Sequence, residues 1–224
     1  MAKKKESTLI NMLVALLVIA AVSGGVLGLV YGVTKDAIAE VDQKKNEAAI
    51  KAVLPLENVT YKADTMQFTY EGVNTTFPCN LAFDANGNFQ GAAVKTSEGG
   101  FGGKIDMMVG FLANGTIKGT SVLSHTETPG LGANMTGKFK DQFVDKNPNN
   151  FKLIVKKDGG DVDAITAATI TSRAFSKAVD KAYQAFMANK AQFMNNAPAK
   201  EAAPVMEAAP AEENNETEGG TENE

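Results

Sequence analysis

The chain has 224 residues, of which 44% are hydrophobic and 21% charged, and this length and composition fit one ordinary domain with appendages. The formal net charge of −4 arises in residues 197–224, which hold eight Glu and one Lys, and the rest of the chain builds no basic face of the kind that nucleic-acid binding requires. With one Cys and one His, the chain by itself cannot build an iron–sulfur cluster, a structural zinc site or a c-type haem site, so no metal site is expected and any redox role must use an organic cofactor.

An apolar segment near the N-terminus predicts a membrane anchor. Residues 7–34 carry no charged side chain, and a helix over 9–33 would rise about 37 Å, enough to cross a hydrocarbon core of about 30 Å. The run is longer than the apolar part of a signal peptide, which spans about 7–15 residues, so an uncleaved anchor is preferred over a cleaved leader. Lys3, Lys4 and Lys5 precede the run and no comparable cluster follows it, which predicts a cytoplasmic N-terminus and a soluble part outside the cytoplasm.

Small residues recur every four positions along this anchor, at Ala20, Gly24, Gly28 and Gly32. Such a strip lies on one face of a helix and lets the backbone of another transmembrane helix approach closely. Gly is also common in membrane helices in general. We favour a strip that faces a partner, which would make the protein one component of a complex rather than a solitary anchor.

The rest of the chain predicts an α+β fold. A helical connector over 35–55 is ended by Pro55. Turn signals at 84–88 and 113–115 separate β-type runs, and five such runs are expected at 65–70, 76–83, 89–96, 104–112 and 116–123. Two further short strands are expected at 151–155 and 162–165, and an amphipathic helix at 169–190. This order predicts a mainly antiparallel sheet with flanking helices.

Four parts are therefore predicted. They are the cytoplasmic N-terminus and transmembrane anchor (1–34), the helical connector (35–55), the soluble domain (56–196) and a tail (197–224). The tail has no aromatic residue and an excess of Glu, so it cannot bury enough surface to fold and is expected to be disordered. Cys79 follows Pro78 in an apolar run, and we expect a buried thiol there.

Residues 163–172, DAITAATITS, are the most informative stretch of the chain. Small and hydroxylated residues stand at the point where a β-type run gives way to a helix. A helix N-terminus offers unsatisfied N–H groups and a partial positive charge, which together favour a phosphate group. Hydroxyl groups are added there by Thr166, Thr169, Thr171 and Ser172. An ordinary Ser/Thr cap explains the same residues, and on local physics alone the cap is the favoured interpretation.

The same segment resembles the flavinylation motif D-x-x-[ST]-G-A-T of the FMN-binding subunits of Rnf and sodium-pumping NADH:quinone oxidoreductase complexes. Asp163, Thr166, Ala168 and Thr169 match the motif, in which the final Thr accepts FMN through a phosphoester. Ala167 stands where the family has Gly. If that Gly mainly provides room, Ala costs little, whereas if the position needs a positive φ, Ala strains the turn.

A second segment, SHTETPGLG at 124–132, resembles the H-x-E-T-P-G-L-G loop of the same family. Its Pro and two Gly suit a tight, exposed turn whose backbone can approach a planar ring. In the family this loop lies against the flavin, so the resemblance implies flavin contacts from Glu127, Thr128 and Leu131. His125 is expected to brace the loop by a hydrogen bond rather than to act as a catalytic base. The run GGFGG at 99–103 also resembles the family's glycine-rich turn before a strand.

The resemblance covers the anchor and roughly residues 35–190, and the compact size favours the G subunit of the Rnf complex over its longer relative. It implies an electron carrier with FMN bonded to Thr169 and with Thr166, Ala168, Thr171 and Ser172 around the cofactor. The carrier would have no catalytic residue of its own, because the flavin supplies the redox chemistry. It would be a single-pass protein of the bacterial cytoplasmic (inner) membrane, with its soluble domain on the periplasmic, outer side.

The resemblance also implies partners. These are the other membrane and peripheral subunits of an Rnf-type complex, which couples electron transfer between ferredoxin and NAD to ion translocation, and a flavin transferase for maturation. Two alternatives stay open: a cofactor-free, membrane-tethered binding module outside the cytoplasm, and a flavoprotein of the same domain family that serves another reductase.

Overall fold

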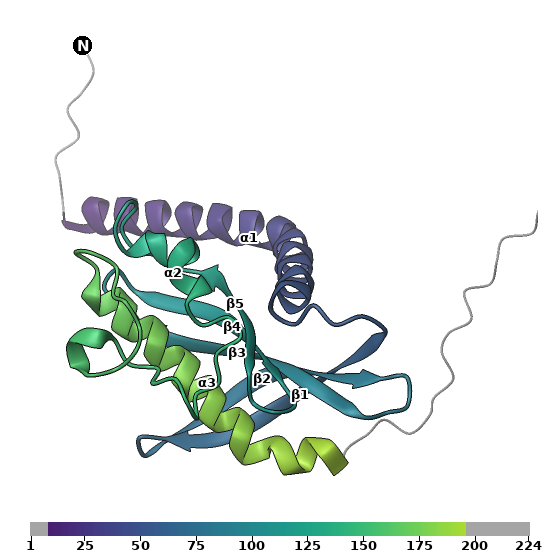
Figure 1. Cartoon of the computed structure of the whole chain (residues 1–224). Coiled ribbons are helices and arrows are strands. Elements are labelled where there is room, and N and C mark those ends of the chain that lie inside the picture. Colours follow the sequence, from purple (N-terminus) through teal and green to yellow (C-terminus); the bar gives the residue numbers. More distant parts are fainter. Residues whose placement is uncertain (1–8, 196–224) are drawn as a thin grey trace, which may run out of the picture.

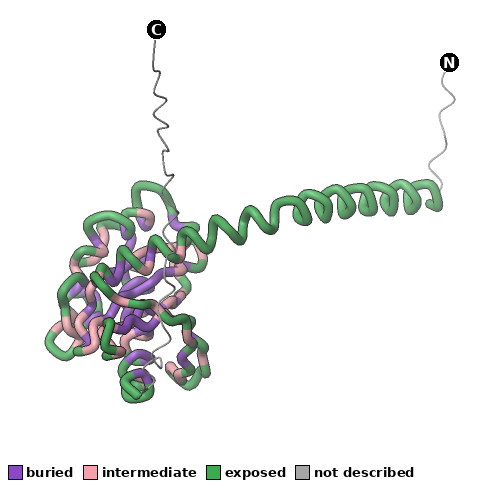
Figure 2. The backbone as a smooth tube through the Cα atoms, turned by 90° about the vertical axis from the view of Figure 1, so that its right-hand side faces the viewer, coloured by how far each residue is buried: buried purple, intermediate pink, exposed green. Residues whose placement is uncertain are grey.

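The computed structural model describes residues 9–195, so the predicted acidic tail at 197–224 lies outside the described residues. Its first element is one continuous helix, α1 (Leu9–Val53), which contains both the predicted anchor and the predicted connector (Figure 1). By length and composition this helix can cross a membrane, and none of its most apolar stretch is buried inside the protein. Figure 2 shows α1 as an exposed arm that projects away from the folded domain.

Five strands form one antiparallel sheet in the order β1-β2-β3-β4-β5. Their bounds are β1 (Val59–Tyr70), β2 (Val73–Asp84), β3 (Phe89–Gly99), β4 (Lys104–Leu112) and β5 (Ile117–Ser124). The five predicted runs are confirmed, although β1 begins well before the expected position 65. A two-residue turn joins β1 to β2, and Glu71 and Gly72 both have positive φ there, as the tight hairpin turns that match strand twist require.

One face of the sheet is covered by the long helix α3 (Thr169–Asn195). Alternate residues of a strand point to opposite faces, so Phe83 packs beneath α3 while Ala82 points to the other side. The predicted helix at 169–190 is confirmed and continues to Asn195. Its buried apolar stripe includes Phe175, Val179 and Phe186. Phe186 stacks on Phe111 of β4, whereas Phe175 contacts Phe139 of the segment at 132–143.

The opposite face receives the C-terminal end of α1. Val53 is fully buried there, in a small cluster with Ala82, Ala93 and Met108. Two glycines make this approach possible, because Gly110 and Gly119 pair across β4 and β5, and a Cβ on either would meet the backbone of Val53. The C-terminal end of α1 is thus packed directly on the sheet.

The two short strands predicted at 151–155 and 162–165 are wrong. This part of the chain forms a loop in which one isolated parallel bridge joins Val155 to Val162, around a short 3-10 helix, η2 (Lys156–Asp158). The alternating apolar residues Phe151, Leu153 and Val155 pack toward α3 instead of belonging to the sheet. A second region without predicted elements contains η1 (Gly132–Thr136) and the short helix α2 (Lys138–Asp141).

Cys79 is a buried thiol, as expected. Its side chain lies in the core between the sheet and α3 with 2% of its surface exposed. Burial raises the pKa of the Cys79 thiol to about 12. The thiol therefore stays protonated at neutral pH, which disfavours its reactive thiolate form.

Candidate functional site

A cavity of about 380 Å³ lies at the N-terminal end of α3. Three segments that are distant in the sequence meet around it: the turn between β3 and β4, the loop after β5, and the start of α3. Six of the eight predicted contact residues line it, namely Glu127, Thr128, Leu131, Ala168, Thr169 and Thr171. The cavity is completed by Phe101, Gly132, Ala167 and Ile170.

Thr169 is the first residue of α3 and is partly exposed on the cavity wall. The first backbone N–H of α3 with a hydrogen-bond acceptor is that of Ser172, which donates to the carbonyl of Ala168, just before the helix, at 3.0 Å. No hydrogen bond among residues 9–195 uses the N–H groups of positions 169, 170 and 171. These three donors, at the positive end of a 27-residue helix, form an arrangement that suits a phosphate group beside the Thr169 hydroxyl.

Ser172 braces the turn that presents Thr169 and does not line the cavity. Its buried hydroxyl donates to the carbonyl of Ala168 at 2.9 Å and accepts the N–H of Ile165 at 2.9 Å. The turn is also closed by the N–H of Ala168, which donates to the carbonyl of Ile165 at 3.0 Å. The side chain of Ser172 thus acts as a cap that joins both sides of the turn.

Thr166 and Asp163 lie outside the cavity. Thr166 is exposed and lines an adjoining groove beside the η1–α2 segment. The carboxylate of Asp163 pairs with the ammonium of Lys156 at 2.8 Å on the surface. The side-chain amide of Gln142 holds the backbone of Asp163 from both sides, since it accepts its N–H at 2.8 Å and donates to its carbonyl at 3.1 Å. These contacts position the segment rather than the cavity wall.

Glu127 joins the three segments of the site. With 5% of its surface exposed, it accepts the N–H of Gly102 at 3.0 Å through one oxygen and the hydroxyl of Thr171 at 2.7 Å through the other. A Cβ on Gly100 or Gly132 would collide with this carboxylate. The glycines that flank the loop therefore provide the room that Glu127 occupies.

His125 braces the same loop, as predicted. Its Nδ1 atom accepts the backbone N–H of Glu127 at 3.2 Å, so the protonated nitrogen of the neutral ring is Nε2. Thr126 adds a second brace, because its hydroxyl donates to the carbonyl of Gly102 at 2.9 Å. His125 is not among the residues that line the cavity.

Replacement of Glu127 tests how far the site depends on this carboxylate. In Glu127→Ala the N–H of Gly102 and the buried hydroxyl of Thr171 lose their acceptor, and we expect the free energy of unfolding to fall by about 2 kcal/mol or more. Glu127→Gln should lower the free energy of unfolding by less. The amide oxygen can still accept the N–H of Gly102, and the amide nitrogen can donate to the hydroxyl of Thr171. Urea unfolding of the detergent-solubilised chain measures the loss of unfolding free energy in both variants. Equal losses in the two variants would mean that the hydrogen bonds are not what stabilises the loop.

Ala167 adopts a left-handed backbone conformation, with φ of 61°. Of the two possibilities for the Gly of the motif, the structure thus supports the need for a positive φ. An L-residue with a Cβ pays about 1–2 kcal/mol for this conformation. The turn before α3 carries that strain two residues before Thr169.

We therefore expect Ala167→Gly to raise the free energy of unfolding by up to about 1 kcal/mol, since relief of strain outweighs the greater freedom of Gly in the unfolded chain. Ala167→Val should lower it, because a β-branched residue is a worse fit to positive φ. The urea midpoints of the three proteins provide the measurement. A Gly variant less stable than its parent would contradict the left-handed assignment.

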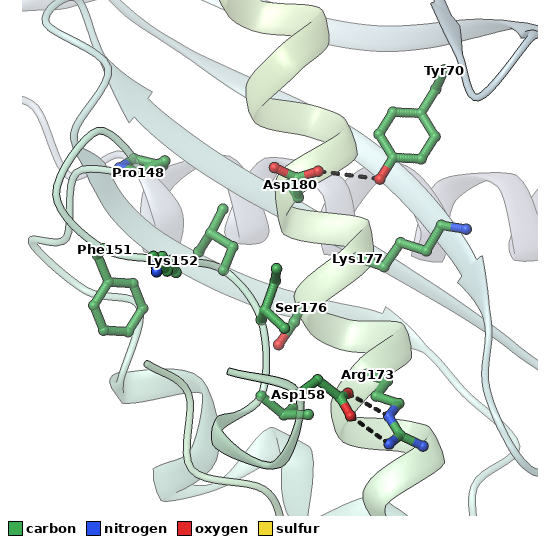
Figure 3. Close-up of a pocket in the computed structure, with 12 residues that line it drawn as sticks. Tyr70, Pro148, Phe151, Lys152, Asp158, Arg173, Ser176, Lys177 and Asp180 are labelled. Carbon is green, nitrogen blue, oxygen red and sulfur yellow. Dashed lines mark hydrogen bonds and ion pairs between the residues drawn. The ribbon is translucent and has the colours of Figure 1, made fainter. Parts of the chain in front are cut away.

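A second cavity, of about 460 Å³, lies between α3 and the loop at 148–158 (Figure 3). None of the predicted contact residues lines it, and several of its polar groups are bonded to one another. The guanidinium of Arg173 forms two bonds of 2.7 Å to the carboxylate of Asp158, and the hydroxyl of Tyr70 donates to Asp180 at 3.1 Å. Burial raises the pKa of Asp180. These pairs attach the loop and β1 to α3, and the cavity is not a second candidate for the cofactor.

Three cavity residues were missed by sequence reasoning: Phe101, Gly132 and Ile170. Phe101 stands alone between two pairs of glycines, and a large apolar residue in such a turn is the signal that could have identified it. Ile170 follows Thr169 and is half-exposed although it lies in an amphipathic helix. Gly132 belongs to the loop motif at 124–132, but its place in the cavity wall was not predicted, because the atoms that exclude a side chain there come from Glu127 and Thr171.

Comparisons with known proteins agree with this geometry. The family described as FMN-binding domain matches residues 100–184, which include all three segments of the cavity. The G subunit of the ion-translocating oxidoreductase complex of Vibrio atlanticus is 35% identical over 75% of this chain and 86% of its own length. The corresponding G subunit of Methanosarcina acetivorans is 33% identical over 81% of this chain and 95% of its own length.

Two solved structures are also similar. The crystal structure of NqrC from Shewanella oneidensis is 22% identical, with a TM-score of 0.43 over 65% of this chain and 73% of that chain. The C subunit of the Na⁺-translocating NADH-quinone reductase from Parabacteroides distasonis is 18% identical, with a TM-score of 0.48 over 69% and 94%.

Proposed function

Since the chain belongs to the family of the G subunits of ion-translocating oxidoreductase complexes, we propose that it is a membrane-anchored, electron-carrying flavoprotein whose FMN is bonded through its phosphate to the hydroxyl of Thr169. Family membership and the FMN-binding domain support a flavoprotein role in a multi-subunit membrane complex. The single observation that carries the covalent link is the position of Thr169: its side chain lines a cavity at a helix N-terminus whose first N–H groups are unpaired among the described residues.

The residues present fit FMN. The phosphate would lie at the start of α3, against the free N–H groups of positions 169–171, where the helix dipole favours negative charge. The cavity volume of about 380 Å³ falls in the range of about 300–1,000 Å³ that is typical of cofactor sites. Its apolar walls, formed by Phe101, Leu131 and Ile170, suit a flat ring system. Gly132 leaves room for the carboxylate of Glu127 in the cavity wall.

In this proposal the protein positions the cofactor and does no chemistry on it. FMN supplies single-electron transfer when it is bound. Thr169 serves as a tether, the α3 N-terminus balances the phosphate charge, and Glu127 holds the turn and the loop in place through Gly102 and Thr171. Maturation needs a flavin transferase: the Thr169 oxygen bonds to the FMN phosphorus of FAD, the phosphoanhydride bond breaks, and AMP leaves with the hydroxyl proton.

The partners in the proposal are the other subunits of an Rnf-type complex, which couples ferredoxin and NAD electron transfer to ion translocation. We place the anchor in 1–34, the connector in 35–55 and the FMN-binding domain in 56–196. The basic cluster before the anchor supports a cytoplasmic N-terminus and a soluble domain on the outer side of the membrane. The strip at Ala20, Gly24, Gly28 and Gly32 is exposed in the chain by itself, which leaves it open to a partner helix.

Intact-mass measurement tests the proposal directly. The full chain, purified from cells that contain the transferase, should be heavier than its sequence by one FMN less one water, and it should give a fluorescent band on a denaturing gel. Protein from cells without the transferase should have the bare mass. A bare mass in both preparations would instead favour a cofactor-free binding module, and a flavinylated chain that co-purifies with a different reductase would favour the other alternative.

A further inference from the structure

Phe101 occupies an unusual place for an aromatic residue. Between Val59 and Asn195 it is the only exposed aromatic side chain, with 70% of its surface accessible, and it stands at the mouth of the cavity that Thr169 lines. Large apolar side chains favour burial, and isolated exposed ones on a surface need no explanation. Phe101 is not isolated, because Leu131 and Ile170, which are 42% and 51% exposed, line the same cavity. Three segments thus direct apolar groups to one opening.

The backbone that carries Phe101 is fixed although its side chain is free. The turn closes on itself through the N–H of Gly100, which donates to the carbonyl of Gly103 at 2.7 Å. It is attached to the neighbouring loop on two sides, since Gly102 donates its N–H to Glu127 at 3.0 Å and accepts the hydroxyl of Thr126 at 2.9 Å. Phe101 is therefore held over the opening by a turn that cannot easily move away.

We infer that Phe101 packs against the isoalloxazine ring of the FMN on Thr169, and that it positions the ring and limits its contact with water. This inference rests on the proposed function, because it needs the flavin in the cavity. An aromatic side chain gains from offset or edge contact with another flat ring, and Phe101 has no such partner within the described residues. The isoalloxazine ring would thus supply the apolar contact that the exposed side chain of Phe101 lacks.

The test uses Phe101→Trp in the full chain made together with the flavin transferase. Indole quenches excited flavin on contact by electron transfer, so the variant should have much weaker flavin fluorescence than wild type at the same FMN content. Ile154→Trp is the matched control, since Ile154 is apolar, 49% exposed and outside this cavity. It should stay as bright as wild type. The intact mass of each protein gives its FMN content independently of fluorescence.

A second variant tests the shielding. In Phe101→Ala we expect the collisional quenching constant of the flavin with iodide to rise, because the ring loses the aromatic side chain that limits its contact with solvent. Phe101→Leu should restore part of the protection, and Ile154→Ala should change nothing.

The outcomes separate this inference from the proposed function. One result would overturn the role of Phe101 alone and would favour contact of Phe101 with a partner protein. In it, every protein carries FMN, the flavin fluorescence of Phe101→Trp equals that of Ile154→Trp, and iodide quenching is unchanged in Phe101→Ala. A bare mass for wild type would remove the proposed function, and this inference with it.

Discussion

Thr169→Val is expected to lose all covalently bound FMN while the domain remains folded. The side chain of Thr169 is partly exposed, and none of the hydrogen bonds described among residues 9–195 involves its hydroxyl. Val has the same shape without the oxygen, so the free energy of unfolding should change by less than about 0.5 kcal/mol. The intact mass of the variant, made alongside the transferase, should equal that of the bare chain.

Two further variants show whether a loss of bound FMN in Thr169→Val is specific to the hydroxyl at position 169. Thr166→Val removes the other hydroxyl of the motif, but Thr166 is exposed and lines the adjoining groove, so its FMN mass should persist. Thr169→Ser keeps the oxygen and should retain FMN at least in part. FMN mass on Thr169→Val, or its loss from Thr166→Val alone, would show that the phosphate is bonded elsewhere.

Gly110→Ala should destabilise the junction between the membrane helix and the domain. A Cβ at Gly110 would collide with the backbone carbonyl of Val53, and that carbonyl belongs to the buried end of α1 rather than to a flexible side chain. To relieve this collision, the C-terminal end of α1 would have to move away from the sheet. Overpacking of this kind typically costs about 1–3 kcal/mol, and the urea midpoint of the detergent-solubilised chain should fall accordingly.

The matched control is Gly99→Ala at the end of β3. There a Cβ meets no atom within 4 Å, so the stability should change by no more than about 0.5 kcal/mol. Limited proteolysis gives a second measurement, because an undocked helix end should expose the segment around Val53 in the Gly110 variant only. Equal behaviour of the two variants would mean that α1 is not held by this contact.

Much of the fold could be predicted from local pattern. The turn at 84–88 and the Asn-Gly turn at 114–115 separate strands whose pairing is antiparallel, and the periodic apolar residues of α3 predicted its buried stripe. The alternating apolar residues at 151–165 led to the wrong prediction of two short strands, because residues that alternate toward one side need not belong to a sheet. Phe151 and Val155 face α3 from a loop, which their spacing alone does not distinguish from a strand.

By itself the sequence determined a candidate membrane-spanning helix, the need for an organic cofactor in any redox role and the position of the motif that contains Thr169, since these follow from composition, length and a local pattern. Only the tertiary structure decided the rest of the site. The positive φ of Ala167 and the two bracing bonds of Ser172 are local, but the residue pattern does not specify them. The meeting of Phe101, Leu131 and Thr169 at one cavity depends on segments that come together across the fold. Glu127 shows the physical reason: its two hydrogen bonds reach positions 25 residues before it and 44 after it, a distance over which sequence spacing predicts no contact.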